Sequence, residues 1–168
     1  MDLYAKILVV SDGVAAGVRE DAAGPRLESR LTGAGYTVVE RRLVPDGIDS
    51  VSAALWEMVD DFAGLVVTTG GTGFSPRDLT PEATLLVLDR EAPGLGEAMR
   101  QVNPLGRLSR ARAGTAGRSL VLNLPGSPKG AVECLDAVLD VLAHALELLA
   151  GSDGPHPPET GGSTATSS

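Results

Sequence analysis

Residues 64–73 have the sequence GLVVTTGGTG, in which a short apolar segment leads directly into a glycine-rich turn. An uninterrupted apolar segment that ends in turn residues is typical of a strand buried on both faces of a parallel sheet. Three other segments share this form, and polar or turn-forming residues follow each of them. They are residues 7–10, residues 36–39 with 43–44, and residues 119–122. The sequence therefore predicts four buried strands.

Helix-compatible segments separate these strands. Residues 25–31 have helical spacing, and Ser50 is a candidate N-cap for a helix whose apolar positions recur every three or four residues across 51–62. A further helix is expected between Pro93 and Pro104, whereas residues 105–117 have the composition of a loop with a short strand.

Two Thr-Pro or Ser-Pro pairs predict the starts of two more helices. Thr80 with Pro81, and Ser127 with Pro128, have the residue types of an N-cap and a first helical position. We expect the first helix to reach about residue 90 and the last to continue to about residue 149. The alternation predicts an α/β fold in three layers, a mostly parallel sheet with helices on both faces.

Composition limits the class of protein. A chain of 168 residues has the size of one domain, which we place at residues 1–150. Residues 151–168 are mainly Gly, Pro, Ser and Thr, and they predict a disordered tail. The net charge of −8 argues against a nucleic-acid partner.

Other sequence features favour a cytoplasmic location. Cys134 is the single cysteine, so no intrachain disulfide can form, and its place on an apolar helix face predicts a core residue. The segment 7–10 is too short for a signal-peptide core. The apolar segment 137–150 contains three polar, titratable residues, so we expect no membrane span.

Every unusual loop follows the carboxyl end of a predicted strand, where ligands bind in folds of this type. In residues 68–73, glycine allows backbone amides to approach an anion closely and threonine hydroxyls add donors, although a plain tight turn explains the sequence equally well. Asp78 could hold Mg²⁺ or only favour a helix start, and Asp46 could do the same or form a Pro-Asp-Gly turn.

Basic residues near the same loops suggest a second element of a phosphate site. The segment 125–129 would place a helix N-terminus and Lys129 at the crevice. The arginines of residues 107–118 form the single basic concentration of an acidic chain. Arginine can grip phosphate with two donors, but a solvated basic face is an equally good interpretation.

Taken together, these segments resemble the MogA/MoaB family of molybdenum-cofactor biosynthesis proteins over about residues 5–150. The stretches that carry the resemblance lie in order along the chain. They are Ser11-Asp12-Gly13, Ala16-Gly17, Glu20-Asp21, Val44-Pro45-Asp46, 68–73, 77–83, Pro93-Gly94, Gly96-Glu97, Leu108-Ser109-Arg110 and 123–129. Gly13 departs from a common pattern of the family, in which arginine follows Ser-Asp.

The resemblance implies a molybdopterin adenylyltransferase that uses Mg²⁺ and ATP and releases pyrophosphate. Asp46 and Asp78 match the two aspartates that the family needs for activity, and they become the expected catalytic residues and metal ligands. Ser109 matches a position tied to molybdopterin binding, and residues 69–73 match the phosphate-binding segment. The complete set of expected substrate-binding residues is Ser11, Asp12, Thr69, Gly70, Gly71, Thr72, Gly73, Ser109, Arg110, Pro125, Gly126, Ser127 and Lys129.

The resemblance also implies a homotrimer and hand-over of the product to a molybdate-inserting enzyme. Two alternatives remain open at this point. The same pocket could carry molybdopterin without adenylating it, or the domain could serve only as a structural trimerisation unit.

Overall fold

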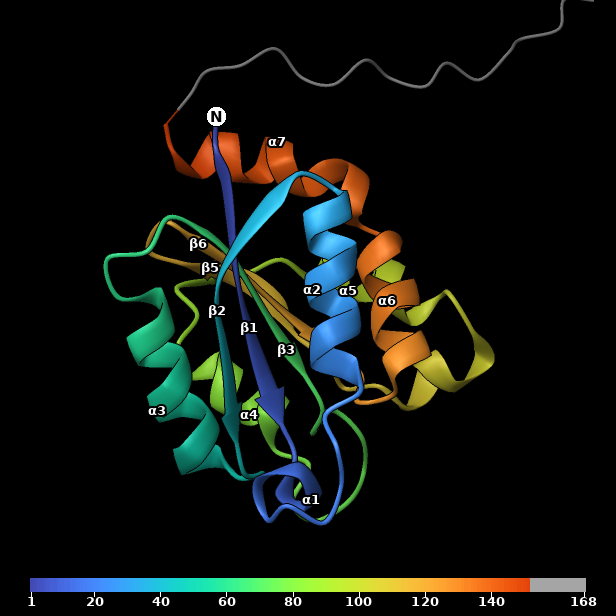
Figure 1. Cartoon of the computed structure of the whole chain (residues 1–168). Coiled ribbons are helices and arrows are strands. Elements are labelled where there is room, and N and C mark those ends of the chain that lie inside the picture. The colour runs from blue at the N-terminus through green and yellow to red at the C-terminus, as the bar shows by residue number, and fades with distance from the viewer. Residues whose placement is uncertain (152–168) are drawn as a thin grey trace, which may run out of the picture.

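A computed structural model describes residues 1–151 and contains one six-stranded sheet with the strand order β2-β1-β3-β6-β5-β4 (Figure 1). Four of its strands are parallel, and they match the four predicted strands with longer bounds. These are β1 (Leu3–Val10), β2 (Tyr36–Val44), β3 (Gly64–Thr69) and β6 (Ser119–Leu124). Two short antiparallel strands, β5 (Ala113–Ala116) and β4 (Arg90–Glu91), complete one side.

Register places the carboxyl ends of the parallel strands at one edge of the sheet. Thr69 pairs with Val9 on one side and with Leu124 on the other, and Val10 pairs with Val44. In Figure 1 this edge lies beside α1 (Asp12–Ala15), far from the N-terminus and α7. All the loops singled out by the sequence that follow parallel strands therefore meet at one end of the molecule.

Helices cover both faces of the sheet, so the predicted three-layer α/β class is confirmed (Figure 1). One face carries α2 (Ala23–Gly33), α5 (Pro93–Arg100), α6 (Pro128–Asp136) and α7 (Leu139–Leu149), and the other carries α3 (Ile48–Val59) and α4 (Thr80–Leu85). A 3-10 helix, η1, spans Pro104–Leu108.

Each face of the sheet has its own apolar core. Leu27 and Leu135 from helices pack with Ile7 in the first core, whereas Leu55 from α3 packs with Leu8 in the second. The side chains of these four leucines and of Ile7 are all fully buried. Ile7 and Leu8 are neighbours on β1, so the alternation of side chains along a strand supplies both cores.

Several sequence predictions were wrong in detail. The closing helix is two helices, because α6 ends at Asp136 and α7 begins at Leu139. The helix that begins near Thr80 ends at Leu85 and not near residue 90, where β4 pairs with β5 instead. Ser50 lies inside α3, and its hydroxyl donates to the carbonyl of Pro45 at 2.7 Å.

The cap predicted at Ser127 is confirmed, since its Oγ accepts the Gly130 amide at 3.2 Å. Thr80, in contrast, is the first residue of α4 and makes no such capping bond. The tail predicted for residues 151–168 lies, apart from Gly151, outside the described residues. Within residues 1–151, no helix has both the length and the apolar character that crossing a membrane requires.

Candidate active site

A cavity of about 480 Å³ opens at the carboxyl ends of β1, β2, β3 and β6. The loops after these four strands and the starts of α2 and α6 form its wall. The expected site residues that line it are Ser11, Asp46, Thr69, Gly70, Gly71, Asp78, Gly126 and Ser127. The fold thus brings together residues that are up to 116 positions apart, as the parallel arrangement of the strands requires.

The glycine loop needs glycine at two successive positions. Gly70 has φ +105°, and a Cβ there would lie 2.1 Å from the carbonyl oxygen of Val10. Gly71 has φ +68°, and its Cβ would lie 2.2 Å from the Thr80 hydroxyl. The loop is therefore pressed against β1 and α4, in a backbone conformation that side chains disfavour.

Hydrogen bonds fasten this loop to the loop after β6. The amide of Gly70 donates to the carbonyl of Leu124 at 3.1 Å, and the Thr69 hydroxyl donates to the carbonyl of Pro125 at 2.8 Å. Gly126 lies against Gly70, with only 3.4 Å between the position of a Cβ on residue 126 and the Gly70 Cα. The predicted phosphate-binding segment and the predicted 125–127 segment are one packed unit.

Asp12 and Asp46 join the first two loops by reciprocal bonds. The Asp46 carboxylate accepts the Asp12 amide at 2.8 Å, and the Asp12 carboxylate accepts the Asp46 amide at 3.1 Å. Arg77 closes this pair, donating to Asp12 at 2.5 Å and 3.0 Å and to the Asp46 carbonyl at 2.6 Å. The hydrogen bond from Arg77 lowers the pKa of Asp12.

Asp46 is held in an environment that disfavours its charge. Burial raises the pKa of its carboxyl, and the negative charges of Asp12 and Asp78 act in the same direction. The Asp12 amide and the Arg77 charge oppose this rise without cancelling it. A cation bound beside Asp46 and Asp78 would relieve the repulsion between them, which suits a metal–phosphate site.

Asp78 stands at the end of the glycine loop. Its Oδ2 accepts the Ser75 amide at 3.0 Å and lies 2.9 Å from the position that a Cβ of residue 73 would occupy. Gly73 therefore leaves room for the carboxylate. Within residues 1–151, no three side chains of the His, Cys, Asp or Glu type are grouped so that they could hold a metal by themselves.

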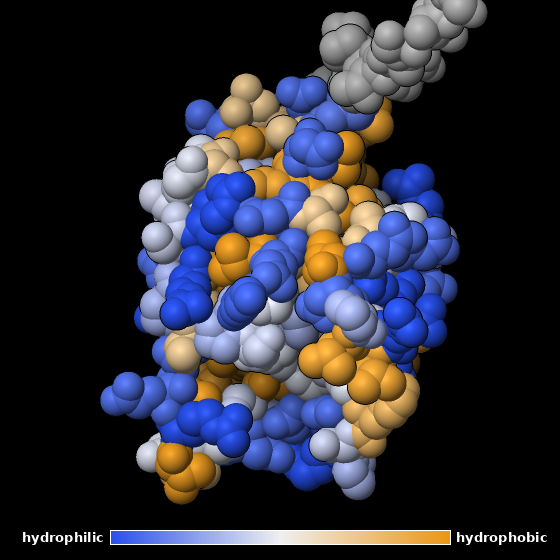
Figure 2. All heavy atoms as spheres, turned by 90° about the vertical axis from the view of Figure 1, so that its right-hand side faces the viewer, coloured by the Kyte–Doolittle hydropathy of each residue, from blue (hydrophilic) through white to orange (hydrophobic). Residues whose placement is uncertain are grey.

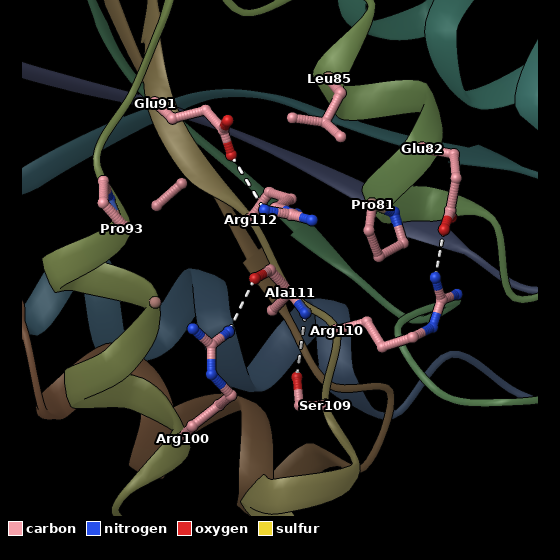
Figure 3. A pocket seen from close by; sticks show the side chains of 12 residues that line it. Pro81, Glu82, Leu85, Glu91, Pro93, Arg100, Ser109, Arg110, Ala111 and Arg112 are labelled. Atoms are coloured by element: carbon pink, nitrogen blue, oxygen red, sulfur yellow. Dashed lines mark hydrogen bonds and ion pairs between the residues drawn. The ribbon is translucent and has the colours of Figure 1, made fainter.

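Ser109 and Arg110 line a second hollow of about 320 Å³ (Figure 3). Its wall combines apolar side chains of α4 and α5, such as Leu85 and Pro93, with Arg100 and Arg112. Arg110 lies at its border, but its guanidinium is bonded to the carbonyl of Gly73 at 2.8 Å, to that of Asp78, and to Glu82. These protein oxygens accept one N–H from each guanidinium nitrogen, that is, three of its five donors.

A small hollow of about 120 Å³ shares lining residues with both larger ones. Ser127 belongs to it and to the first cavity, whereas Ser109 belongs to it and to the second hollow. Pro125 also lines it, with the buried Cys134 behind. The three hollows thus adjoin one another, with Ser127 and Ser109 in their shared walls.

The remaining expected residues, which line none of these three hollows, are Asp12, Thr72, Gly73 and Lys129. Thr72 is buried, and its carbonyl accepts the Arg110 amide at 2.9 Å. Lys129 lies outside the site. Its side chain is 83% exposed, its Nζ lies 3.7 Å from Glu133 Oε1, and it borders a shallow groove between α2 and α6. Figure 2 shows that side of the molecule, where hydrophilic residues cover most of the surface between smaller hydrophobic groups.

Sequence reasoning missed Arg77, Thr80 and residues 19–23, all of which contact or line the site. Arg77 directly precedes Asp78, which was a usable signal. No spacing rule, however, connects residue 77 with residues 12 and 46, which it bridges here.

Comparison with known proteins identifies the family of this chain. Positions 6–144 match the family model described as "Probable molybdopterin binding domain". The chain belongs to this family. The predicted resemblance to MogA/MoaB proteins is thereby confirmed, since solved structures of that group share the fold.

Two relatives of known name are similar along most of the chain. The molybdopterin adenylyltransferase of Escherichia coli K12 is 45% identical over 141 residues, which cover 80% of this chain and 72% of the relative. That of Helicobacter pylori J99 is 38% identical over 157 residues, or 89% of each chain.

Solved structures superpose closely on the fold. The molybdopterin biosynthesis enzyme MoaB of Thermus thermophilus has a TM-score of 0.83 at 47% identity, covering 89% of this chain and 98% of its own. The Mog protein of Mycobacterium ulcerans has a TM-score of 0.83 at 39% identity, covering 90% and 99%.

Proposed function

We propose that this chain is a molybdopterin adenylyltransferase, which transfers AMP from ATP to the terminal phosphate of molybdopterin and releases pyrophosphate. Relatives that are 38–45% identical carry this name, so the chain has a role in molybdenum cofactor biosynthesis. The observation that carries the proposal is the set of adjoining hollows. A cavity with carboxylates and glycine amides adjoins a hollow lined by Ser109.

The first cavity suits the triphosphate with Mg²⁺. Asp46 and Asp78 would hold the cation, because Mg²⁺ is commonly bound by one or two carboxylates together with phosphate oxygens and water. Bound Mg²⁺ supplies positive charge against the phosphate oxygens. The Gly71 amide and the start of α6 at Ser127 add donors from the protein, whereas the Gly70 amide is already bonded to Leu124.

The second hollow suits the pterin, which is flat and partly apolar. Leu85 and Pro93 offer apolar contacts, and Ser109 lies between this hollow and the small one that adjoins it. A terminal phosphate of molybdopterin bound near Ser109 would face the first cavity. One of its oxygens then forms a bond to the α-phosphorus of ATP, and the bond from that phosphorus to the bridging oxygen of the leaving pyrophosphate breaks.

Such a transfer depends mainly on positioning and charge compensation, so no covalent protein intermediate is needed. In this chain the positioning comes from the packed loops. Arg77 holds the Asp12–Asp46 pair, and Arg110 holds the end of the glycine loop. Arg110 acts mainly by holding these loops, because each nitrogen of its guanidinium already donates to a protein oxygen.

The test is incubation of the purified chain with ATP, Mg²⁺ and molybdopterin. We expect one pyrophosphate for each adenylyl-molybdopterin formed, with no product when Mg²⁺ is omitted. Asp46→Asn and Asp78→Asn should abolish the product. A carrier would bind molybdopterin without forming pyrophosphate, and that result would contradict the proposal.

The assembly and setting are part of the same proposal. We place the chain in the cytoplasm as a homotrimer that hands its product to a molybdate-inserting enzyme. Sedimentation of the purified chain tests the trimer. If the domain served only assembly, both aspartate variants would still form the trimer and the wild type would form no pyrophosphate.

A further inference from the structure

Thr80 carries a hydroxyl that is buried and has no hydrogen-bond partner. The residue is 0% exposed, and its Oγ1 accepts and donates no bond within the described residues. Its backbone is fully engaged, because its amide donates to the carbonyl of Gly71 at 3.1 Å. A buried polar group without a partner destabilises a fold, so its presence needs a reason.

The hydroxyls and amides around Thr80 are all paired, which makes the contrast clear. The Thr84 hydroxyl donates to the Thr80 carbonyl at 2.8 Å and accepts from the Asn123 side-chain amide at 2.9 Å. That amide also donates to the Thr68 hydroxyl at 3.0 Å. Among the side chains of Thr68, Thr80, Thr84 and Asn123, only Thr80 Oγ1 lacks a partner within the described residues.

A free acceptor lies on the other side of Gly71. Of the two oxygens of the Asp46 carboxylate, Oδ2 accepts the Asp12 amide at 2.8 Å. Oδ1 makes no hydrogen bond within residues 1–151. The position that a Cβ of residue 71 would take is 2.2 Å from Thr80 Oγ1 and 3.0 Å from Asp46 Oδ1. The free donor and the free acceptor thus both border the space that Gly71 leaves open by having no side chain.

We propose that Thr80 is a positioning residue for Asp46. When a divalent cation and a nucleotide occupy the cavity, the Thr80 hydroxyl donates to Asp46 Oδ1 across Gly71 and fixes the orientation of the carboxylate. The inference rests on the proposed function for the cation–nucleotide cavity. It adds a residue that does not line that cavity and that acts through Asp46.

The proposal separates stability from binding. Thr80→Val keeps the shape of the side chain and removes the unpaired hydroxyl, so the ligand-free chain should melt at a higher temperature. The same change removes a hydrogen bond to a carboxylate in the occupied site. The affinity for Mg·ATP should then fall about tenfold or more.

Thr115 provides a matched control. Its hydroxyl on β5 is also buried without a partner, and Thr115 pairs with Arg90 and Leu120. Leu120 lies toward the start of β6, whereas Leu124 at the end of that strand reaches the site. Thr115→Val should raise the melting temperature and leave the affinity for Mg·ATP unchanged.

The experiment compares wild type, Thr80→Val, Thr80→Ser and Thr115→Val. Thermal unfolding is followed by circular dichroism, Mg·ATP binding by calorimetry, and Mn²⁺ with ATP by the electron paramagnetic resonance of the metal. We expect Thr80→Ser to keep the wild-type affinity and the wild-type Mn²⁺ spectrum, because it retains the donor. Thr80→Val should change both.

The inference would be overturned if Thr80→Val bound Mg·ATP with an affinity within twofold of wild type. It would also be overturned if this variant melted at a lower temperature than wild type. Both results leave the proposed function standing if wild type still forms pyrophosphate. A wild-type chain that binds no Mg·ATP would instead overturn the proposed function together with this inference.

Discussion

A methyl group at position 70 is expected to destabilise the chain and to weaken nucleotide binding. Gly70 has φ +105°, beyond the left-handed range that other residues occasionally adopt, and such a conformation costs about 1–3 kcal/mol. The new Cβ would lie 2.1 Å from the Val10 carbonyl oxygen, where ordinary contact begins at 3.4 Å. Overpacking of this kind adds about 1–3 kcal/mol. Gly70→Ala should therefore lower the free energy of unfolding by about 2–6 kcal/mol and the melting temperature by about 5–20 °C.

Gly117→Ala separates the cost of the backbone from that of the contact. Gly117 has φ +56° and nothing within 4 Å of its Cβ position, so only about 1–2 kcal/mol should be lost there. Urea unfolding measures both free energies, and calorimetry measures ATP affinity. We expect Gly70→Ala to lose more stability than Gly117→Ala and to bind ATP far more weakly. Equal stability losses in the two variants would refute the reasoning about the contact with Val10.

Three further predictions concern charged residues. Asp46→Asn should raise the melting temperature of the ligand-free chain, because folding raises the pKa of Asp46 and so disfavours its ionised form. This gain should grow as the pH rises through the folded pKa and vanish below the ordinary value of 3.8. No dependence of the gain on pH would contradict it. Arg77→Ala should raise the pKa of Asp12 toward its ordinary value, which NMR titration can measure. The ionised Asp12 stabilises the folded chain above pH 3.8, and this contribution is lost as the pH falls through the lowered pKa, so the variant should lack it. An unshifted Asp12 pKa would count against that role. Lys129→Ala should change Mg·ATP affinity less than twofold, because the side chain faces the α2–α6 groove, and a larger loss in calorimetry would restore the sequence-based assignment.

The sequence predicted the fold and the place of the site because parallel strands impose both. Four apolar segments have to lie side by side, and the residues that follow them have to meet at one edge. Asp46, Gly70 and Ser127 could therefore be assigned to one cavity before any contact was known.

Tertiary interactions decided what the sequence could not show. The segment between α6 and α7 contains Ala137 and Val138, which do not interrupt helical spacing, so the break between the helices was invisible. The apolar pattern after Leu85 likewise continues, but pairing of Arg90 with Thr115 forms a strand there. These competing partners are distant in the sequence.

Arg110 has a structural role that its sequence context did not show. Its position in a basic segment next to Ser109 suggested a phosphate ligand, and in the structure its three guanidinium nitrogens donate to oxygens of Gly73, Asp78 and Glu82. A planar guanidinium can satisfy such a set, whereas the single ammonium group of a lysine cannot. The Arg110 amide also binds Thr72, so the residue fastens the glycine loop of the first cavity to the chain that carries Ser109 into the second. Arg110 therefore ties a wall of the first hollow to a wall of the second, and its loss would disturb both even if it bound no phosphate.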